Sequence, residues 1–224
     1  MSNPPRINSV LFDLDGTLAD TSPDMVDALN ILFKKIGKPS VDYELARKIT
    51  SRGSIALIQL GFEHPLEDPL RKQLQKQYLQ IYAENLCNKT TLFPGVDELL
   101  NSLDENKTPW GIVTNKPANL AEPLLKELKI AERCGCLVSG DTLPKRKPHP
   151  DPLHHAAKIL NIKEQDTIYI GDDPRDIQAG KAAGMATAVA SYGYIQDNEN
   201  PRNWGADILF SQPMELKDWL FPNS

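Results

Sequence analysis

Two aspartates separated by one residue, Asp13 and Asp15, stand where the segment 7–12 runs into a turn at Gly16. The apolar residues Val10, Leu11 and Phe12 at the end of this segment are typical of a strand that is buried on both faces of a parallel sheet. The acids are therefore expected at the carboxyl end of that strand, where open α/β sheets bind ligands. Adjacent carboxylates repel each other unless a cation lies between them, and a hard, oxygen-liganded ion suits them. Ordinary turn chemistry is the alternative explanation.

Polar residues follow a second predicted strand, residues 110–113, in the same manner. Thr114, Asn115 and Lys116 stand at its end, and a helix is predicted over residues 119–128. A hydroxyl group and the free N–H groups at a helix N-terminus suit the oxygens of a phosphate group. The same residues also make a good helix start, so this segment alone does not identify a phosphate site.

A third cluster is the run of cations Lys145, Arg146 and Lys147, which is unusual in a chain with an excess of acids. Pro148 restricts the backbone of Lys147, and a helix is predicted to start near Pro152. We expect Lys147 to point inward. A solvated basic loop and a nuclear-type basic patch are the alternatives.

A fourth cluster follows the predicted strand 167–171. Asp173 as N-cap, Pro174 at the first helical position and Asp176 at the third form a good helix start. Asp172 has no such capping role. If this strand lies beside the first predicted strand, the carboxylates of Asp172 and Asp13 come to one side of a shared cation.

The elements that must position these clusters form a repeated strand-helix pattern. Further strands are predicted at residues 136–139, 186–190 and 206–210, and a final helix at 214–220. The pattern predicts an α/β fold, a Rossmann-like doubly wound sheet with at least five parallel strands.

Between the first two strands the chain shows only helical patterns, the first with Ser22 as its N-cap. The predicted helices lie at about residues 23–37, 41–49, 54–60 and 69–86. A connection of this size is too long for a simple crossover. We therefore predict a core made of residues 1–20 and 87–224, and an inserted α-helical cap made of residues 21–86.

Composition narrows the classes of function. The 224-residue chain is 40% hydrophobic, which is ample for a core, and its net charge of −5 provides no basic surface for nucleic acid. No signal sequence is recognised and no apolar run approaches the roughly 20 residues of a membrane span, so we expect a cytoplasmic protein. The three cysteines lack the spacing of a redox or zinc site. The oligomeric state is not readable from the sequence.

In this order, with a helical insert after the first, the four clusters resemble the four motifs of the haloacid dehalogenase superfamily. The matching segments are residues 13–17, 114–116, 147–148 and 171–176. The resemblance covers nearly the whole chain, and it is greatest to phosphoglycolate phosphatase-type enzymes with an α-helical cap. Among these, the N-acetylmuramic acid 6-phosphate phosphatases are similar at residues 110–111, 121–123, 175–177, 192–195 and 204–207.

The resemblance implies a Mg²⁺-dependent phosphatase that acts on a small phosphorylated metabolite through an aspartyl phosphate. It makes Asp13 the nucleophile and Asp15 the general acid and base. The implied metal site consists of Asp13, the backbone carbonyl of Asp15 and Asp172, with Asp176 and Asp173 around them. The implied phosphate-binding residues are Thr114, Asn115 and Lys147. Many members carry a small residue where Asp173 stands, so its part in the metal shell stays open.

Substrate choice is expected to depend on the cap, because phosphate and metal are common to every substrate. Ser51, Arg52 and Gly53 form a short polar loop between the second and third predicted helices, and the family places a cap loop over the leaving group. Arg52 offers a cation for a substrate carboxylate, which the two leading substrates, phosphoglycolate and N-acetylmuramate 6-phosphate, both carry. A helix-helix turn with a solvated arginine is the alternative.

Three other functions fit part of the pattern. Haloacid dehalogenases of this superfamily lack the second acid and work without magnesium, so Asp15 argues against that activity. Phosphosugar mutases share all four motifs and differ mainly in the cap, so the sequence separates them poorly from phosphatases. A non-catalytic phosphate-binding protein is disfavoured because every catalytic position is filled.

Overall fold

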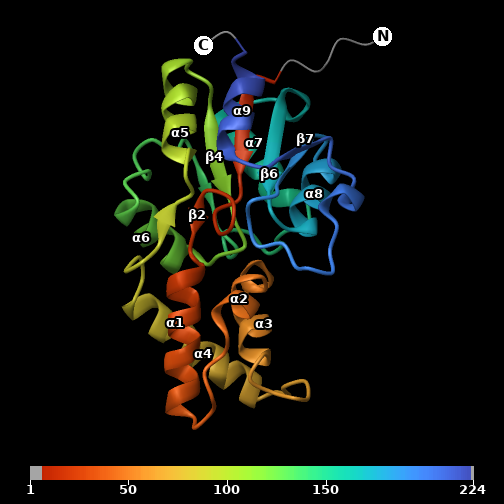
Figure 1. Cartoon of the computed structure of the whole chain (residues 1–224). Coiled ribbons are helices and arrows are strands. Elements are labelled where there is room, and N and C mark those ends of the chain that lie inside the picture. Colours follow the sequence, from red (N-terminus) through yellow and green to blue (C-terminus); the bar gives the residue numbers. More distant parts are fainter. Residues whose placement is uncertain (1–6, 223–224) are drawn as a thin grey trace.

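The computed structural model describes residues 7–222, so the predicted outer ends of the core, residues 1–6 and 223–224, lie outside it. Its centre is a six-stranded parallel sheet with the strand order β5-β4-β1-β6-β7-β8 (Figure 1). The strands are β1 (Ser9–Phe12), β4 (Trp110–Val113), β5 (Leu137–Val138), β6 (Thr167–Gly171), β7 (Ala186–Ala190) and β8 (Ile208–Phe210). This sheet confirms the predicted doubly wound α/β fold.

The first strand occupies the middle of the sheet. β1 pairs with β4 on one side and with β6 on the other, with Leu11 opposite Gly111 and Tyr169. The chain therefore runs outward from β1 to β4 and β5, then returns to continue through β6, β7 and β8. Reversals of this kind open a crevice at the carboxyl ends of the central strands, which is where doubly wound sheets bind ligands.

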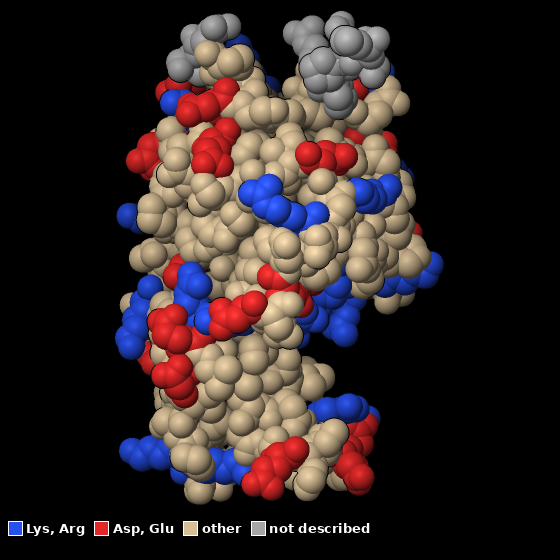
Figure 2. Space-filling model, turned by 45° about the vertical axis from the view of Figure 1, so that its right-hand side comes forward, with Lys and Arg blue, Asp and Glu red and all other residues tan. Residues whose placement is uncertain are grey.

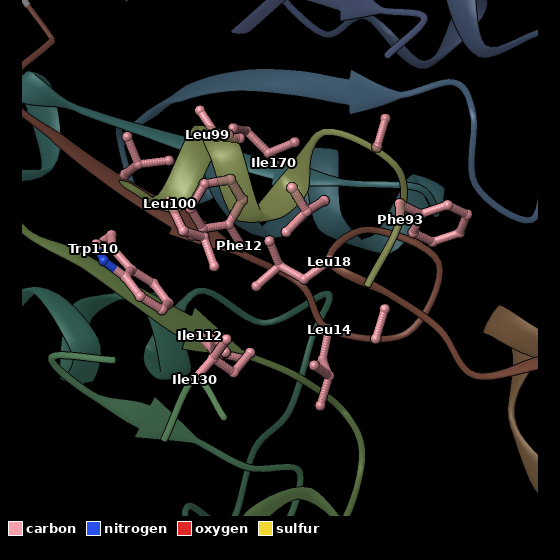
Figure 3. Packing of buried hydrophobic residues seen from close by; sticks show 14 of the residues in the cluster. Phe12, Leu14, Leu18, Phe93, Leu99, Leu100, Trp110, Ile112, Ile130 and Ile170 are labelled. Carbon is pink, nitrogen blue, oxygen red and sulfur yellow. The ribbon is translucent and has the colours of Figure 1, made fainter. Parts of the chain in front are cut away.

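Helices cover both faces of the sheet because residues of the central strands alternate between two apolar clusters. Phe12 of β1 packs in one cluster with Leu99 and Leu100 (Figure 3), whereas its neighbour Leu11 packs in another with Leu153. The first cluster draws on α5 (Val96–Glu105), α6 (Ala118–Glu127) and α9 (Pro213–Leu220). The second draws on α7 (Asp151–Leu160) and α8 (Pro174–Ala182). Short 3-10 helices lie at Glu164–Asp166 and Pro201–Trp204.

Four helices form a separate part below the carboxyl edge of the sheet (Figure 1). They are α1 (Ser22–Lys35), α2 (Tyr43–Arg47), α3 (Ser54–Gln59) and α4 (Leu70–Glu84), with a 3-10 turn at Thr50–Arg52. We call this part the helical unit. Its apolar cluster includes Leu29, Phe33, Leu57 and Tyr78, and the core contributes Leu120 of α6 to it. In the space-filling view the molecule narrows between its two parts, and basic side chains gather under the overhang of the upper part (Figure 2).

The connection between the two parts differs from the prediction. A two-stranded antiparallel pair, β2 (Ala19–Asp20) and β3 (Thr91–Leu92), lies where the chain leaves and re-enters the core. The prediction of Ser22 as an N-cap is wrong, because α1 begins at Ser22 and Thr21 occupies the N-cap position. The Ser22 hydroxyl bonds to Asp20 Oδ1 at 2.7 Å instead of capping the helix.

In the part of the chain that the structure describes, no helix combines the length and the hydropathy that crossing a membrane requires.

Candidate active site

Asp13 lies directly beyond β1, at the carboxyl edge of the sheet. Its backbone N–H donates to the carbonyl of Ile170 in β6 at 2.8 Å, which extends the strand pairing and fixes the side chain. Asp13 Oδ1 accepts a hydrogen bond from the backbone N–H of Leu14 at 2.7 Å and lies 2.9 Å from Lys147 Nζ. Within the described residues no donor bonds to Oδ2, which leaves that oxygen available to a substrate.

Lys147 points inward, as the sequence predicted. Its side chain is 2% exposed, and Nζ lies 2.9 Å from Asp13 Oδ1 and 2.7 Å from Asp176 Oδ1. It also donates to the carbonyl of Val113 at 3.0 Å and to the Tyr169 hydroxyl at 2.8 Å. Burial lowers the pKa of Lys147, but the two carboxylates outweigh burial and hold the pKa above its ordinary value. The ammonium group is therefore a permanent charge at this edge of the sheet.

Asp172 reaches the same place from the end of β6. Its Oδ2 accepts from the Tyr194 backbone N–H at 2.8 Å and from the Ser51 hydroxyl at 2.7 Å. The backbone packs closely here, since a Cβ on Gly193 would lie 2.3 Å from the carbonyl oxygen of Gly16 and 2.4 Å from Asp172 Cβ. Gly16 itself has φ +81°, which favours glycine.

Three buried carboxylates, those of Asp13, Asp172 and Asp176, converge at this point. One oxygen from each lies within 4.8 Å of the others. Burial raises the pKa of Asp13 to about 7, and the nearby Asp176 and Asp15 carboxylates add to this effect while Lys147 opposes it. Burial and the same crowding raise the pKa of Asp172 well above its ordinary range. Mutual repulsion of this kind is relieved by a hard cation with oxygen ligands, so these residues fit a divalent metal ion.

Asp173 stands apart from these three carboxylates. It is the N-cap of α8, and with Asp176 it forms a capping box, as the sequence predicted. Its Oδ1 accepts from the Arg175 backbone N–H at 2.9 Å and from Arg175 Nε at 2.7 Å. Burial raises the pKa of Asp173, but the Arg175 and Arg52 guanidinium groups outweigh it and bring the pKa below its usual value. The charge of the Asp173 carboxylate is therefore balanced by arginine side chains.

Asp15 has other partners than these three carboxylates. Its Oδ1 accepts from the Thr21 hydroxyl at 2.7 Å and lies 2.8 Å from Lys116 Nζ. Lys116 is 4% exposed and also donates to the Tyr82 hydroxyl of α4 at 2.9 Å. Residues from the loop after β4, from α4 and from the start of α1 thus hold this carboxyl group in one position.

The loop after β4 supplies the predicted phosphate-binding groups. Thr114 is buried, and its Oγ1 accepts from the Lys116 backbone N–H at 3.1 Å, which leaves its hydroxyl hydrogen free to donate. Asn115 Nδ2 donates to the backbone carbonyl of Lys147 at 3.1 Å. Its Oδ1 is buried without a partner among the described residues. Asn115 therefore ties the Thr114 loop to the Lys147 loop.

A cavity of about 200 Å³ lies between these loops and the helical unit. Asp13, Asp15 and Lys147 line it from the core side. The helical unit contributes an apolar wall with Tyr78 and Leu79. A cavity with a polar edge on one side and apolar side chains on the other is typical of a small-molecule site.

The predicted cap loop also lines the cavity. Besides the hydrogen bond from Ser51 to Asp172, the backbone carbonyl of Ser51 accepts from Arg175 Nη2. Gly53 has φ +84° and links the 3-10 turn to α3. Arg52 Nη2 contacts Glu199 Oε1, and its Nε lies 3.7 Å from Asp173 Oδ2. The loop thus meets the core edge through Ser51, while the Arg52 guanidinium is held by two acids of the core.

Comparison with known proteins identifies the family. Residues 10–190 match the family model of haloacid dehalogenase-like hydrolases. The chain belongs to this family. Similar relatives include the N-acetylmuramic acid 6-phosphate phosphatase of Pseudomonas putida, 39% identical over 212 residues that cover 95% of each chain. The phosphoglycolate phosphatase of Xanthomonas campestris is 41% identical over 208 residues, covering 93% of this chain and 94% of the relative.

Solved structures agree with this assignment of the chain to the haloacid dehalogenase-like hydrolases. A predicted phosphoglycolate phosphatase from Haemophilus somnus is similar with a TM-score of 0.85 and 28% identity, covering 96% of this chain and 98% of the other. The resemblance seen in the four sequence clusters is thereby confirmed.

Sequence reasoning missed several residues of this hydrolase's site. Lys116 was noted only as the cation at the polar end of the second predicted strand, without a partner, and its pairing with Asp15 joins positions 101 residues apart. Tyr194 bonds to Asp172 through its backbone and to Asp20 Oδ1 through its hydroxyl at 2.7 Å. The signal for Lys116 was present, since a cation directly follows the polar end of a central strand.

Proposed function

We propose that this hydrolase cleaves small phosphate monoesters through an aspartyl phosphate, and that phosphoglycolate and N-acetylmuramate 6-phosphate are its leading substrates. One observation supports this proposal most strongly. Asp13 and Asp15 line one cavity yet face different partners, since Asp13 contacts Lys147 and Asp15 contacts Lys116. Two carboxyl groups in different environments suit two different roles. The names of the similar relatives point to the same reaction class.

In the first step Asp13 acts as the nucleophile. Its Oδ2 attacks phosphorus, and the bond between phosphorus and the ester oxygen breaks. Lys147, 2.9 Å from Asp13 Oδ1, neutralises the negative charge of the phosphoryl group as it approaches the carboxylate. Thr114 and Asn115 serve as the remaining phosphate-binding residues.

Asp15 acts as general acid and then as general base. It gives a proton to the departing ester oxygen and later takes a proton from the water that attacks the aspartyl phosphate. The second step breaks the bond between phosphorus and Asp13 and releases phosphate. The contacts of Asp15 with Thr21 and Lys116 keep the carboxyl group oriented through both steps.

We assign Mg²⁺ to the group formed by Asp13, Asp172 and the backbone carbonyl of Asp15, with Asp176 beside them and Asp173 farther out. When bound, the ion polarises the phosphoryl group and offsets its negative charge. The crowded carboxylates and the raised pKa values of Asp13 and Asp172 support this assignment.

Residues 21–86 are assigned as a cap over the core formed by residues 1–20 and 87–224. The helical unit has its own apolar cluster and roofs the cavity, which supports this division. The loop with Ser51, Arg52 and Gly53 closes the cavity beside the phosphoryl site. The substrate is a small metabolite of the cytoplasm.

A phosphate-release screen tests the proposed function. Purified protein is incubated with phosphoglycolate, N-acetylmuramate 6-phosphate and a set of sugar phosphates, with Mg²⁺ or with excess chelator. We expect release from at least one of the two leading substrates and none in chelator. Full rate in chelator would exclude the metal assignment. Phosphoryl transfer from a bisphosphate without phosphate release would show that the protein is a mutase and not a phosphatase.

A further inference from the structure

Five basic side chains line the cavity, and their partners differ. They are Arg52, Lys116, Arg146, Lys147 and Arg175. Ion pairs join Lys147 to Asp13 and Asp176, Lys116 to Asp15, Arg175 to Asp173, and Arg52 to Asp173 and Glu199. Of the five, only Arg146 has no acidic side chain of the described residues within ion-pair distance.

The acidic side chains of the cavity also leave Arg146 without a partner. The four carboxylates that line it, those of Asp13, Asp15, Asp173 and Asp176, all belong to the core and all face a cation already. The residues that the helical unit contributes to the lining include no acid. The guanidinium of Arg146 is therefore the charge in this cavity that the described part of the protein leaves uncompensated.

Arg146 and Lys147 are adjacent in sequence but occupy different depths. Lys147 is buried against Asp13, whereas Arg146 is exposed at the rim. The segment is held on both sides, because Asn115 Nδ2 donates to the Lys147 carbonyl at 3.1 Å and the His149 N–H donates to the Arg146 carbonyl at 3.0 Å. Lys147 thus meets the phosphoryl end of a substrate, and Arg146 can meet the group that extends outward from it.

We propose that Arg146 binds a carboxylate on the leaving group and so selects phosphate monoesters that carry a second anionic group. This inference rests on the proposed phosphatase function and names the substrate class of the same site. Arg146 is a specificity-determining residue in this account. A planar guanidinium suits a carboxylate because it can form two parallel hydrogen bonds with it.

Arg52, which the sequence favoured for this role, has a different environment. Its contacts with Glu199 and Asp173 join the helical unit to two core segments. These two acids already balance the charge of Arg52, which weakens its attraction for a substrate carboxylate. Arg52 is therefore the matched control for Arg146, since both are arginines that line one cavity.

The experiment uses substrate pairs that differ in the carboxylate. N-acetylmuramate 6-phosphate is compared with N-acetylglucosamine 6-phosphate, which lacks the carboxylate-bearing ether group, and phosphoglycolate is compared with ethyl phosphate. Values of kcat/KM are measured for the parent, Arg146→Gln and Arg52→Gln. We expect Arg146→Gln to lose roughly 10- to 100-fold on the carboxylate member that the parent prefers, and less than about threefold on its partner. Arg52→Gln is expected to change both members of a pair by the same factor.

With an active parent, three results would overturn the inference. Equal losses by Arg146→Gln on both members would place the residue in phosphate binding or folding. No loss by Arg146→Gln on either member would show that other residues bind the carboxylate. A selective loss only in Arg52→Gln would show the same. An active parent in these cases leaves the phosphatase proposal intact, whereas no phosphate release by the parent from any substrate would overturn both.

Discussion

At the scale of single residues, the roles proposed for Asp13 and Asp15 differ, and Asp15 provides a sharp test. Asp15→Asn should lower steady-state turnover of an alkyl phosphate by about 10²- to 10⁴-fold, because proton transfer contributes that much. With p-nitrophenyl phosphate, whose leaving group departs without a proton, we expect a burst of about one product molecule per enzyme. Slow turnover should follow the burst, since water attack still lacks its base. Rapid-mixing absorbance measures both phases, and unchanged steady-state rates would contradict the role.

Titration of Asp13 should make the stability of the folded protein depend on pH. Its folded-state pKa of about 7 lies above the ordinary value of 3.8, so between these values the folded protein binds more protons than the unfolded chain. Stability therefore falls as pH rises from about 4 to 7 and stays low above 7. Metal-free protein should show a lower Tm at pH 8 than at pH 5, and Asp13→Asn should reduce this slope.

The control for the pH prediction is Asp97→Asn, at an exposed aspartate whose side chain is 63% accessible. Thermal unfolding in chelator at several pH values gives the slopes. If both Asp13→Asn and Asp97→Asn keep the parent's dependence of Tm on pH, burial of the Asp13 carboxylate does not cause the loss of stability at high pH.

Single residues were predictable from the sequence where local chemistry determines them. Asp173 and Asp176 form the capping box that their spacing predicts, and Lys147 points inward beside its proline. Lys116 was missed because its partner Asp15 is brought close only by the pairing of β1 with β4. No local pattern encodes such a contact.

At the scale of elements, the loop after β7 packs against the carboxyl edge of the sheet at Asp172. Gly193 packs against the turn after β1 and against Asp172, and the next residue donates its backbone N–H to Asp172. Gly193→Ala should displace these neighbours, cost about 1–3 kcal/mol of stability and lower Tm by about 2–4 °C per kcal/mol. It should also lower kcat/KM at least tenfold, because Asp172 moves with the loop.

Gly37→Ala is the control for this effect. Gly37 has φ +71°, and a Cβ added there would meet nothing within 4 Å, so the change adds backbone strain without a clash. Its stability should fall while its activity is retained. If Gly193→Ala keeps parental activity, the loop does not support Asp172.

The sequence predicted most elements because their patterns are strong. The bounds predicted for β4, β6 and β7 match the observed ones, because strands buried in a parallel sheet form largely apolar runs in the sequence. The two-residue strands β2 and β3 were missed because they are too short to show a period. The first N-cap was assigned one residue late because Thr21 and Ser22 are both good caps, and the hydroxyl of Thr21 is used by Asp15.

At the scale of the whole molecule, the site exists only when both parts of the chain come together. The core supplies the carboxylates and Lys147, while the helical unit supplies the roof of the cavity. The ion pairs of Lys48 with Asp197 and of Arg52 with Glu199 join the two parts. Their pairing could not be read from the sequence, since the core partners, Asp197 and Glu199, lie far along the chain in a loop with no regular pattern.

The central claim is that Asp13 becomes phosphorylated during turnover. Parent protein mixed with its preferred substrate and Mg²⁺, quenched in acid within the first turnover and mapped by mass spectrometry should carry one phosphoryl group on the peptide that contains Asp13. Asp13→Asn should fold, carry no phosphoryl group and lose turnover by at least about a thousandfold. A phosphoryl group on another residue, or turnover by Asp13→Asn within about tenfold of the parent, would contradict the account.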